Sequence, residues 1–137
     1  MKNYELIEHT ADVGIRVKAS DLKELFTKTA LSMFDIIAEP KKEIGIPKKI
    51  EIKLKADNLD ELFVTWLNEL LSLSATKELI FSDFQIKKID KKHLDAITSG
   101  CDIKNYRINT EIKAATYHEL KLEETKLGWQ AEVIFDV

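Results

Sequence analysis

Two segments of the chain repeat one pattern of hydrophobic and polar positions. The segment 15–26 (IRVKASDLKELF) aligns without gaps on the segment 52–63 (IKLKADNLDELF), and seven of the twelve pairs are identical. Each copy begins with alternating apolar and polar residues, as in a half-buried strand, and passes through a polar cap into the spacing of a helix. The pattern therefore predicts two strand–helix units. Two copies are too few for a solenoid, which needs about three or more.

Both predicted helices begin at a capping pair and present one broad apolar face. Asp21 and Glu24 form a capping-box-like pair before the first helix, and Asn58 and Glu61 take the same places before the second. Apolar residues then recur with the period of a helix. They are Leu22, Leu25, Phe26, Ala30, Met33, Phe34 and Ile37 in the first copy and Leu59, Leu62, Phe63, Trp66, Leu67, Leu70 and Leu71 in the second. We expect both faces to pack in the core, and we assign Trp66 no binding role.

The rest of the chain alternates with the period of a strand. Prolines at 40 and 47 predict a loop between the two units. Strands are expected at 13–18, 50–55, 84–87, 93–99, 106–114 and 129–137. Because strands outnumber helices, we predict an α+β fold in which two amphipathic helices pack on a largely antiparallel β-sheet. The 137 residues suit a single domain, with the internal repeat at about 13–56 and 50–90.

Charge narrows the choice of partners. The chain has 33% charged residues but a formal net charge of only -3, so its surface must mix both signs. Of the 21 basic residues only Arg16 and Arg107 are arginine, the side chain favoured for bidentate contacts to phosphate and guanine. The lysine clusters are typical of solvated loops and strand edges. We therefore expect no direct, sequence-specific binding of nucleic acid.

Cysteine content and hydropathy indicate the compartment. Cys101 is the only cysteine, which excludes a disulfide framework or a cysteine-based zinc site within one chain and favours a reducing environment. The first residues carry charges every few positions, unlike a secretory signal. No stretch approaches the ~18 apolar residues of a membrane helix. We expect a cytoplasmic protein without a membrane partner.

Common catalytic signatures are missing from the sequence. The four glycines stand apart at 14, 45, 100 and 128, so there is no glycine-rich phosphate loop. The chain also has no Gly-x-Ser-x-Gly elbow and no His-Glu-x-x-His helix.

Two aspartates form a candidate metal site. Asp12 directly precedes the first predicted strand, and Asp136 is followed by Val137 with its terminal carboxylate. If the first and last strands are neighbours, three carboxylates converge and favour a hard cation such as Ca²⁺ or Mg²⁺, whereas zinc prefers nitrogen and sulfur. Strand alternation places Asp136 opposite the apolar face and predicts that it is accessible. The same spacings also describe two solvated aspartates, and His9 alone is as typical of a strand-end hydrogen bond as of a ligand.

A second pair of residues supports a rival hypothesis. Glu111 and Lys113 place an acid and a lysine on one strand face, as in some metal-dependent nucleases or phosphodiesterases. Glu51 and Lys53 repeat that spacing, and a cross-strand charge ladder explains both pairs. A chaperone-like or ligand-binding module is the other alternative.

Four motifs, taken together and in order, closely resemble the archease family. They are His9-Thr-Ala-Asp12-Val-Gly, the segment 60–71 (DELFVTWLNELL), Lys113-Ala-Ala-Thr-Tyr-His118 and the final Val133-Ile-Phe-Asp136-Val137. The resemblance implies a fold of duplicated strand-helix-strand-strand units. It also implies an accessory protein that is not itself an enzyme: archeases activate the RtcB-type tRNA-splicing RNA ligase by promoting its guanylylation from GTP and its repeated turnover.

The resemblance also implies the residues of the site. The metal site of the family falls on Asp12, Asp136 and Val137, with calcium as the expected ion and magnesium as the substitute. Lys113 and His118 match motif positions and, with His9, are expected to face the ligase or to support the site. If the strand that contains Lys113 continues through His118, the imidazole takes an apolar position, which favours a structural role.

Overall fold

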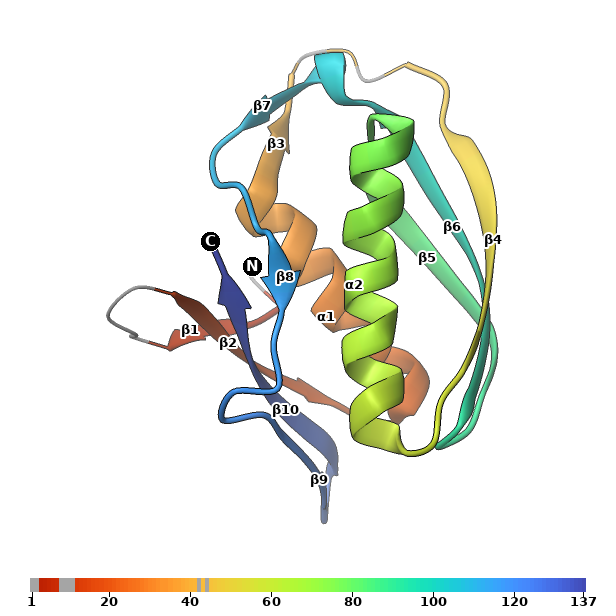
Figure 1. Cartoon of the computed structure of the whole chain (residues 1–137), viewed down its shortest axis with the longest axis vertical. Helices are drawn as coiled ribbons and strands as arrows, with labels where there is room; N and C mark the ends of the chain where they lie inside the picture. The colour runs from red at the N-terminus through yellow and green to blue at the C-terminus, as the bar shows by residue number, and fades with distance from the viewer. Residues whose placement is uncertain (1–2, 8–11, 42, 44) are drawn as a thin grey trace.

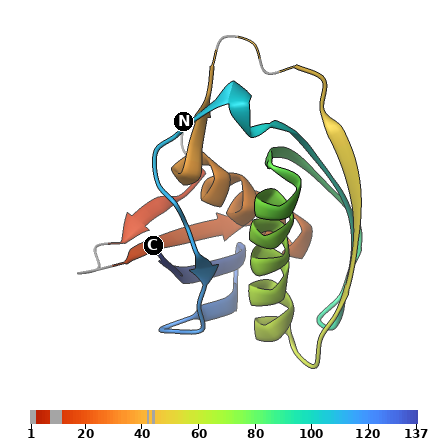
Figure 2. The same cartoon turned by 45° about the horizontal axis from the view of Figure 1, so that its top comes forward.

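The computed structural model describes residues 3–7, 12–41, 43 and 45–137 and shows two helices between two antiparallel sheets (Figure 1). The helices are α1 (Leu22–Ile37) and α2 (Leu59–Lys77). The first sheet has the order β1-β2-β10-β8, with β9 also paired to β10, and the second has the order β4-β6-β5. This arrangement confirms the predicted α+β fold, and the turned view in Figure 2 shows the same layers.

Most predicted strands are present, usually longer than the pattern alone indicates. The first sheet comprises β1 (Glu5–Ile7), β2 (Val13–Ala19), β8 (Ala114–Ala115), β9 (Lys121–Thr125) and β10 (Gly128–Asp136). The second comprises β4 (Lys48–Lys55), β5 (Leu79–Ile89) and β6 (His93–Asp102). A two-stranded sheet pairs β3 (Ala38–Pro40) with β7 (Tyr106–Ile108), which follows the short helix η1 (Ile103–Asn105). None of the helices in the described ranges is long and apolar enough to cross a membrane.

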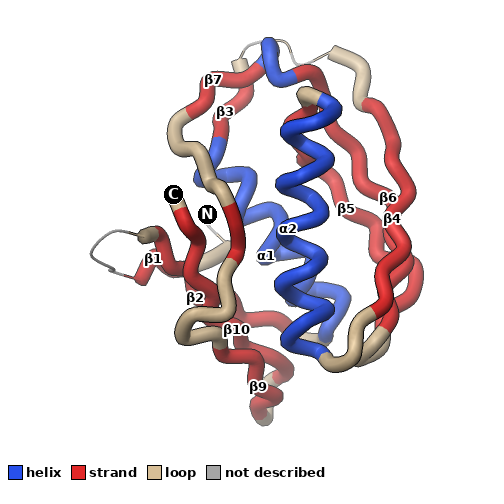
Figure 3. The backbone as a smooth tube through the Cα atoms, in the orientation of Figure 1, coloured by secondary structure: helices blue, strands red, loops and turns tan. Residues whose placement is uncertain are grey.

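The continuous strand predicted at 106–114 is wrong. β7 ends at Ile108, and the backbone N–H groups of Asn109 and Thr110 both donate to the carbonyl of Ile37, at 2.8 and 3.2 Å. These bonds turn the chain away from β3, and pairing resumes only at β8, against β10. We call residues 109–120 the crossing segment, because they carry the chain beside α2 from one sheet to another (Figure 3).

The predicted caps start both helices. The Asp21 carboxylate accepts from the backbone N–H of Glu24 at 2.8 Å, and the Asn58 side chain accepts from that of Glu61 at 2.9 Å. The Glu24 side chain in turn accepts from the backbone N–H and hydroxyl of Ser20, one residue before the cap. Each cap satisfies an N–H that the first turn of a helix leaves without a partner.

Equivalent residues of the repeat meet in the core. Phe26 and Phe63 occupy the same place in the two aligned segments, and their rings contact edge to face with centroids 5.2 Å apart. Trp66 is wholly buried, and its Nε1 donates to the carbonyl of Phe26 at 3.1 Å. This confirms the structural role expected of Trp66, since a buried indole N–H needs an acceptor.

The duplication extends into the hairpins that follow the helices. Arg16, Glu132 and Lys121 form one row across β2, β10 and β9. The matching row across β4, β6 and β5 is Lys53, Asp95 and Lys88. Because Arg16 aligns with Lys53, the unit β2–α1–β9–β10 corresponds to β4–α2–β5–β6, which is inserted between α1 and β9. The ranges predicted from the sequence, about 13–56 and 50–90, overlap at 50–56; β9 and β10 of the first unit and β6 of the second lie outside them.

Candidate metal site at the end of the first sheet

Asp12 and Asp136 occupy neighbouring positions on adjacent strands. β10 pairs antiparallel with β2 as far as Phe135↔Val13; Asp136 is the last residue of β10, and Asp12 is the residue directly before β2. Alternation directs the Asp136 side chain to the outer face of the sheet, opposite the buried Phe135. Asp136 is exposed, as expected, and Asp12 is half-buried. The first strand predicted from the sequence, now β2, and the last strand, β10, are therefore neighbours, which is the condition that the metal-site hypothesis required.

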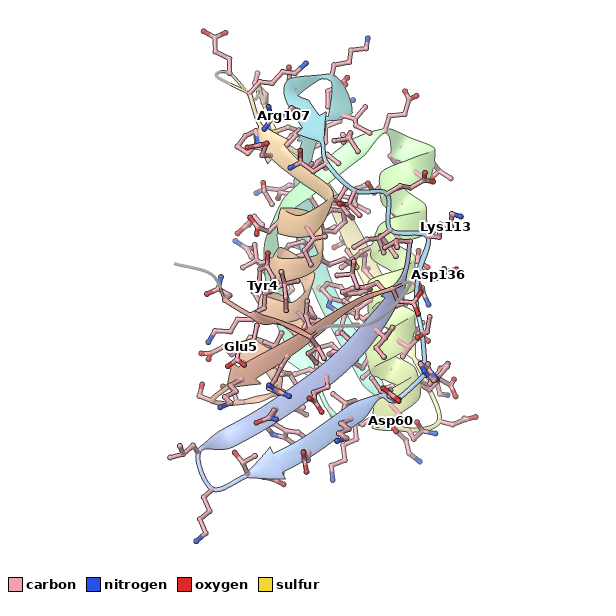
Figure 4. All side chains as sticks on the ribbon, turned by 90° about the vertical axis from the view of Figure 1, so that its left-hand side faces the viewer. Tyr4, Glu5, Asp60, Arg107, Lys113 and Asp136 are labelled. Atoms are coloured by element: carbon pink, nitrogen blue, oxygen red, sulfur yellow. The ribbon has the colours of Figure 1, made fainter. Side chains whose placement is uncertain are left out.

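Lys113 lies beside Asp136, on the other edge of β10 (Figure 4). β8 pairs with β10 through Phe135↔Ala115 and Asp136↔Ala114, and the backbone N–H of Lys113 donates to the carbonyl of Asp136 at 2.8 Å. Val137 follows directly and is 36% exposed. We call Asp12, Asp136 and Val137 the acidic edge. Lys113 is its nearest basic neighbour in the sheet register.

Of the two histidines of the predicted site, only His118 lies within the described residues; His9 lies outside them. His118 is exposed in a turn, and its backbone N–H donates to the Thr116 hydroxyl at 3.3 Å. The condition for an apolar strand position of His118 is not met, because β8 ends at Ala115 and His118 lies in a turn.

The rival pair does not lie on a strand. Glu111 and Lys113 are exposed on either side of the buried Ile112, in the crossing segment before β8. The strand-face geometry that motivated the nuclease hypothesis is therefore missing at these two residues. Glu51 and Lys53, which share their spacing, do lie on a strand, and Lys53 faces Asp95 across β4 and β6 as in a charge ladder.

The chemistry of the acidic edge suits a hard cation. Carboxylate and main-chain oxygens are the donors that Ca²⁺ and Mg²⁺ prefer. Among the described residues no group of three or more His, Cys, Asp and Glu side chains comes together to hold a metal ion. A cation here would therefore depend on the carboxylates of Asp12 and Asp136 and on main-chain oxygens such as those of Val137.

An apolar row separates the acidic edge from a row of ion pairs. Ile7, Gly14 and Ile134 form this row across β1, β2 and β10, and Ile134 is 4% exposed although it faces outward. In the next row Arg16 binds Glu132 at 2.6 Å, and this hydrogen-bonded ion pair lowers the pKa of the Glu132 carboxyl. Glu132 is thus neutralised by a partner, and the next acidic side chain along this face of β10 is that of Asp136.

Asn68 is a residue that the sequence reasoning did not single out. Its Oδ1 accepts from the backbone N–H of Ala115 at 2.8 Å, and its Nδ2 donates to the carbonyl of Ala115 at 3.1 Å. The repeat contains a signal for it: the first helix has Leu31 where the second has Asn68. A polar residue at one copy of a repeated apolar position indicates a contact that the other copy lacks.

The crossing segment continues along α2 toward the start of that helix. Tyr117 is 57% exposed, and its pKa is raised by partial burial and by the negative charges of Glu61 and Asp60 in the first turn of α2. Asn68 and this first turn therefore lie against two successive parts of the crossing segment.

The fold and the site define a class: a duplicated α+β domain whose first unit alone carries an acidic pair at its sheet end. The model of the archease protein family matches residues 4–137. Archease from Methanosarcina acetivorans is 37% identical over 142 residues, covering 99% of this chain and 97% of that protein. Archease from Pyrococcus furiosus is 36% identical over 146 residues, covering both chains completely.

Solved structures agree with the sequence comparisons. The solution structure of a Methanobacterium thermoautotrophicum protein matches with a TM-score of 0.74 and 29% identity over the whole of both chains. A Thermotoga maritima crystal structure, described as an archease and possible chaperone, matches with a TM-score of 0.66 and 24% identity over 96% of this chain and 94% of that one. This chain belongs to the archease family.

Proposed function

We propose that this protein activates an RtcB-type RNA ligase by promoting its guanylylation from GTP and its repeated turnover, and that a cation at the acidic edge serves this role. Family membership supports the activator role. The observation that supports the metal site is the register of β2 and β10, which ends at Phe135↔Val13, directly next to Asp136 and Asp12 in the sequence. In this proposal the protein is an accessory factor in the cytoplasm and performs no catalysis of its own.

The acidic edge suits contact with a nucleotide site. Asp12, Asp136 and the main-chain oxygens of Val137 would hold Ca²⁺, or Mg²⁺ in its place. A bound cation supplies positive charge that stabilises a phosphoryl group during transfer. The two aspartates contribute by fixing that charge at an exposed end of the sheet, where a partner can approach. Lys113 adds a second, permanent positive charge beside Asp136.

The deciding experiment measures uptake of labelled guanylate by a purified cognate RtcB-type ligase. We expect wild-type protein to accelerate uptake, and Asp12→Asn or Asp136→Asn to lower that acceleration at least about 10-fold, since each removes one charged ligand. Asp83→Asn is the matched control: Asp83 is an exposed aspartate of the second sheet, opposite Ser99. The Asp83→Asn variant should accelerate guanylate uptake by the ligase as much as wild-type protein does.

The outcomes separate the two parts of the proposal. No acceleration by wild-type protein would refute the activator role. Full acceleration by both aspartate variants would remove the acidic edge from it. Calcium binding measured by titration calorimetry gives an independent reading of the site.

Chaperone-like activity is the second candidate, because the Thermotoga maritima relative is described as a possible chaperone. Exposed apolar side chains offer limited support: Ile46 is 90% and Leu127 is 92% exposed. The loop before β4 and the β9–β10 turn that carry them lie at opposite ends of the molecule (Figure 1), so they form no continuous patch. Suppressed aggregation of unrelated clients, with unchanged ligase rates, would favour this candidate.

A further inference from the structure

We propose that Asn68 is a positioning residue, which holds the crossing segment and through it the Asp136 end of β10 in the geometry that the acidic edge requires. The inference rests on the proposed function in so far as it assigns that geometry to cation binding. The placement of the backbone by Asn68 can be tested without any cation.

The side-chain amide of Asn68 replaces a neighbouring strand. In an antiparallel pair, residues exchange an N–H···O bond in each direction. Asn68 makes the same exchange with Ala115, at 2.8 Å to the N–H and 3.1 Å from the carbonyl. Since β8 has two residues and lies at the end of its sheet order, this amide completes the pairing on the edge of β8 away from β10.

β8 in turn holds the end of β10. The register between β10 and β2 ends at Phe135, whereas the register with β8 continues to Asp136↔Ala114. The backbone N–H of Lys113 also donates to the carbonyl of Asp136 at 2.8 Å. A path therefore runs from Asn68 on α2 through its two hydrogen bonds to Ala115, along the main chain of the crossing segment to Lys113, and through the Lys113 hydrogen bond to the backbone of Asp136.

Packing alone does not explain an asparagine at this place. The equivalent position of α1 is Leu31, a partly buried leucine that packs against the core. Val64, one turn before Asn68, is 3% exposed, so an apolar side chain would suit this side of α2 as well. An asparagine differs from an apolar residue here because its amide can both donate to and accept from the backbone of Ala115.

Two substitutions of similar size distinguish packing by Asn68 from its hydrogen bonds to Ala115. Asn68→Asp keeps an acceptor for the Ala115 N–H but places a carboxylate oxygen against the Ala115 carbonyl. Asn68→Leu removes both hydrogen bonds and keeps an apolar side chain. Asn58→Asp is the matched control, because it makes the same chemical change on the same helix at the N-cap, where aspartate is equally favoured.

The first readout is amide hydrogen exchange by NMR on the metal-free protein. We expect faster exchange in both Asn68 variants at Ala115, which Asn68 contacts, and at Lys113, which it does not contact but whose N–H binds Asp136. The Asn58→Asp control should exchange as wild type at both amides. Unchanged exchange at Lys113 would overturn the proposal, because the effect of Asn68 would then stop at Ala115.

The second readout is calcium affinity by titration calorimetry. Loss of a residue that orients metal ligands weakens binding about 10- to 100-fold, and we expect this for both Asn68 variants. Ile52→Val in the second sheet removes a methyl group from the core, so it controls for a general loss of stability and should bind calcium as wild type does.

Failure of this inference and failure of the proposed function are distinguishable. If wild-type protein binds no calcium, the metal site of the proposed function is refuted, and the exchange at Lys113 alone decides whether Asn68 positions the end of β10. If wild type binds calcium and the Asn68 variants bind equally well, the positioning role is overturned and the metal site stands.

Discussion

At the scale of single residues, Glu132 links the charge row of the first sheet to its stability. The carboxylate accepts two bonds from Arg16, at 3.0 Å from Nε and 2.6 Å from Nη2, and lies 3.5 Å from the Lys121 ammonium. These bonds lower the pKa of the Glu132 carboxyl in the folded state. The ion pair therefore stabilises the fold at pH values above the pKa of a glutamate in the unfolded chain, about 4.3. This stabilisation is lost as the pH falls through the lower pKa of the folded state.

Glu132→Gln should therefore lower the free energy of unfolding at pH 7 by up to about 1 kcal/mol, the range of a cross-strand charge pair. It should also flatten the decline in stability below about pH 4.3. Urea unfolding at pH 7 and at several pH values down to 3 measures both effects. Glu123→Gln, an exposed glutamate on β9, is the control and should leave the curve unchanged. If the free energy of unfolding declined equally steeply below about pH 4.3 in wild type and in Glu132→Gln, Glu132 would not be the source of this pH dependence.

Residues were predictable where one pattern determined their place. The caps Asp21 and Asn58 and the buried Trp66 follow from helix period and capping chemistry, and all three take their expected roles. Asn68 did not stand out, because its partner is a backbone group 47 positions away in the sequence. Local spacing carries no information about such a contact; the indication lies in the comparison of the two repeats, in which Leu31 of the first corresponds to Asn68 of the second.

At the scale of elements, Gly128 allows the β9–β10 hairpin to lie against the end of β2. Its φ is +139°, and a Cβ there would come 2.2 Å from the carbonyl oxygen of Ala19. Gly128→Ala should therefore cost more than about 1 kcal/mol through backbone strain and collision. Gly45→Ala is the comparison, since Gly45 also has positive φ (+78°) but a Cβ there would lie 3.4 Å from Nδ2 of the Asn105 side chain. Thermal unfolding should show a larger drop in unfolding temperature for Gly128→Ala than for Gly45→Ala. Equal drops would show that the contact between the added Cβ and the Ala19 carbonyl has no effect.

Strand alternation was a good guide to faces and a poor guide to partners. It placed Asp136 on the exposed face of β10 correctly. It also extended one strand through 106–114, where the chain in fact leaves β3 and later joins β10. The two-residue period of a strand identifies the side chains that share a face, but tertiary contacts determine the partner strand. Here those contacts are the hydrogen bonds from Asn109 and Thr110 to the carbonyl of Ile37.

At the scale of the whole molecule, duplication has produced one acidic edge and not two. The row of the second sheet that corresponds to Asp12 and Asp136 contains Lys49 and Ser99, with a single aspartate, Asp83, on the far side of Ser99. A lysine in place of an aspartate makes that row unsuitable for a cation. The two units thus share a scaffold, and only the first carries the acidic pair.

The insertion of one unit into the other predicts that they unfold together. The second unit leaves the first after α1 and returns through β7, the two helices pack between both sheets, and Phe26 meets Phe63 at the centre. Neither unit can lose its helix without exposing the core of the other, so a single cooperative transition is expected for a domain of this size.

The two tryptophans report the two units separately. Trp66 lies on α2 of the second unit and Trp129 on β10 of the first. Trp129→Phe leaves fluorescence from Trp66, and Trp66→Phe leaves fluorescence from Trp129. In each variant, urea unfolding followed by fluorescence should coincide with unfolding followed by far-ultraviolet circular dichroism. A fluorescence midpoint clearly separated from the circular-dichroism midpoint in either variant would show that the units unfold independently, and the shared core would then not couple the acidic edge to the second sheet.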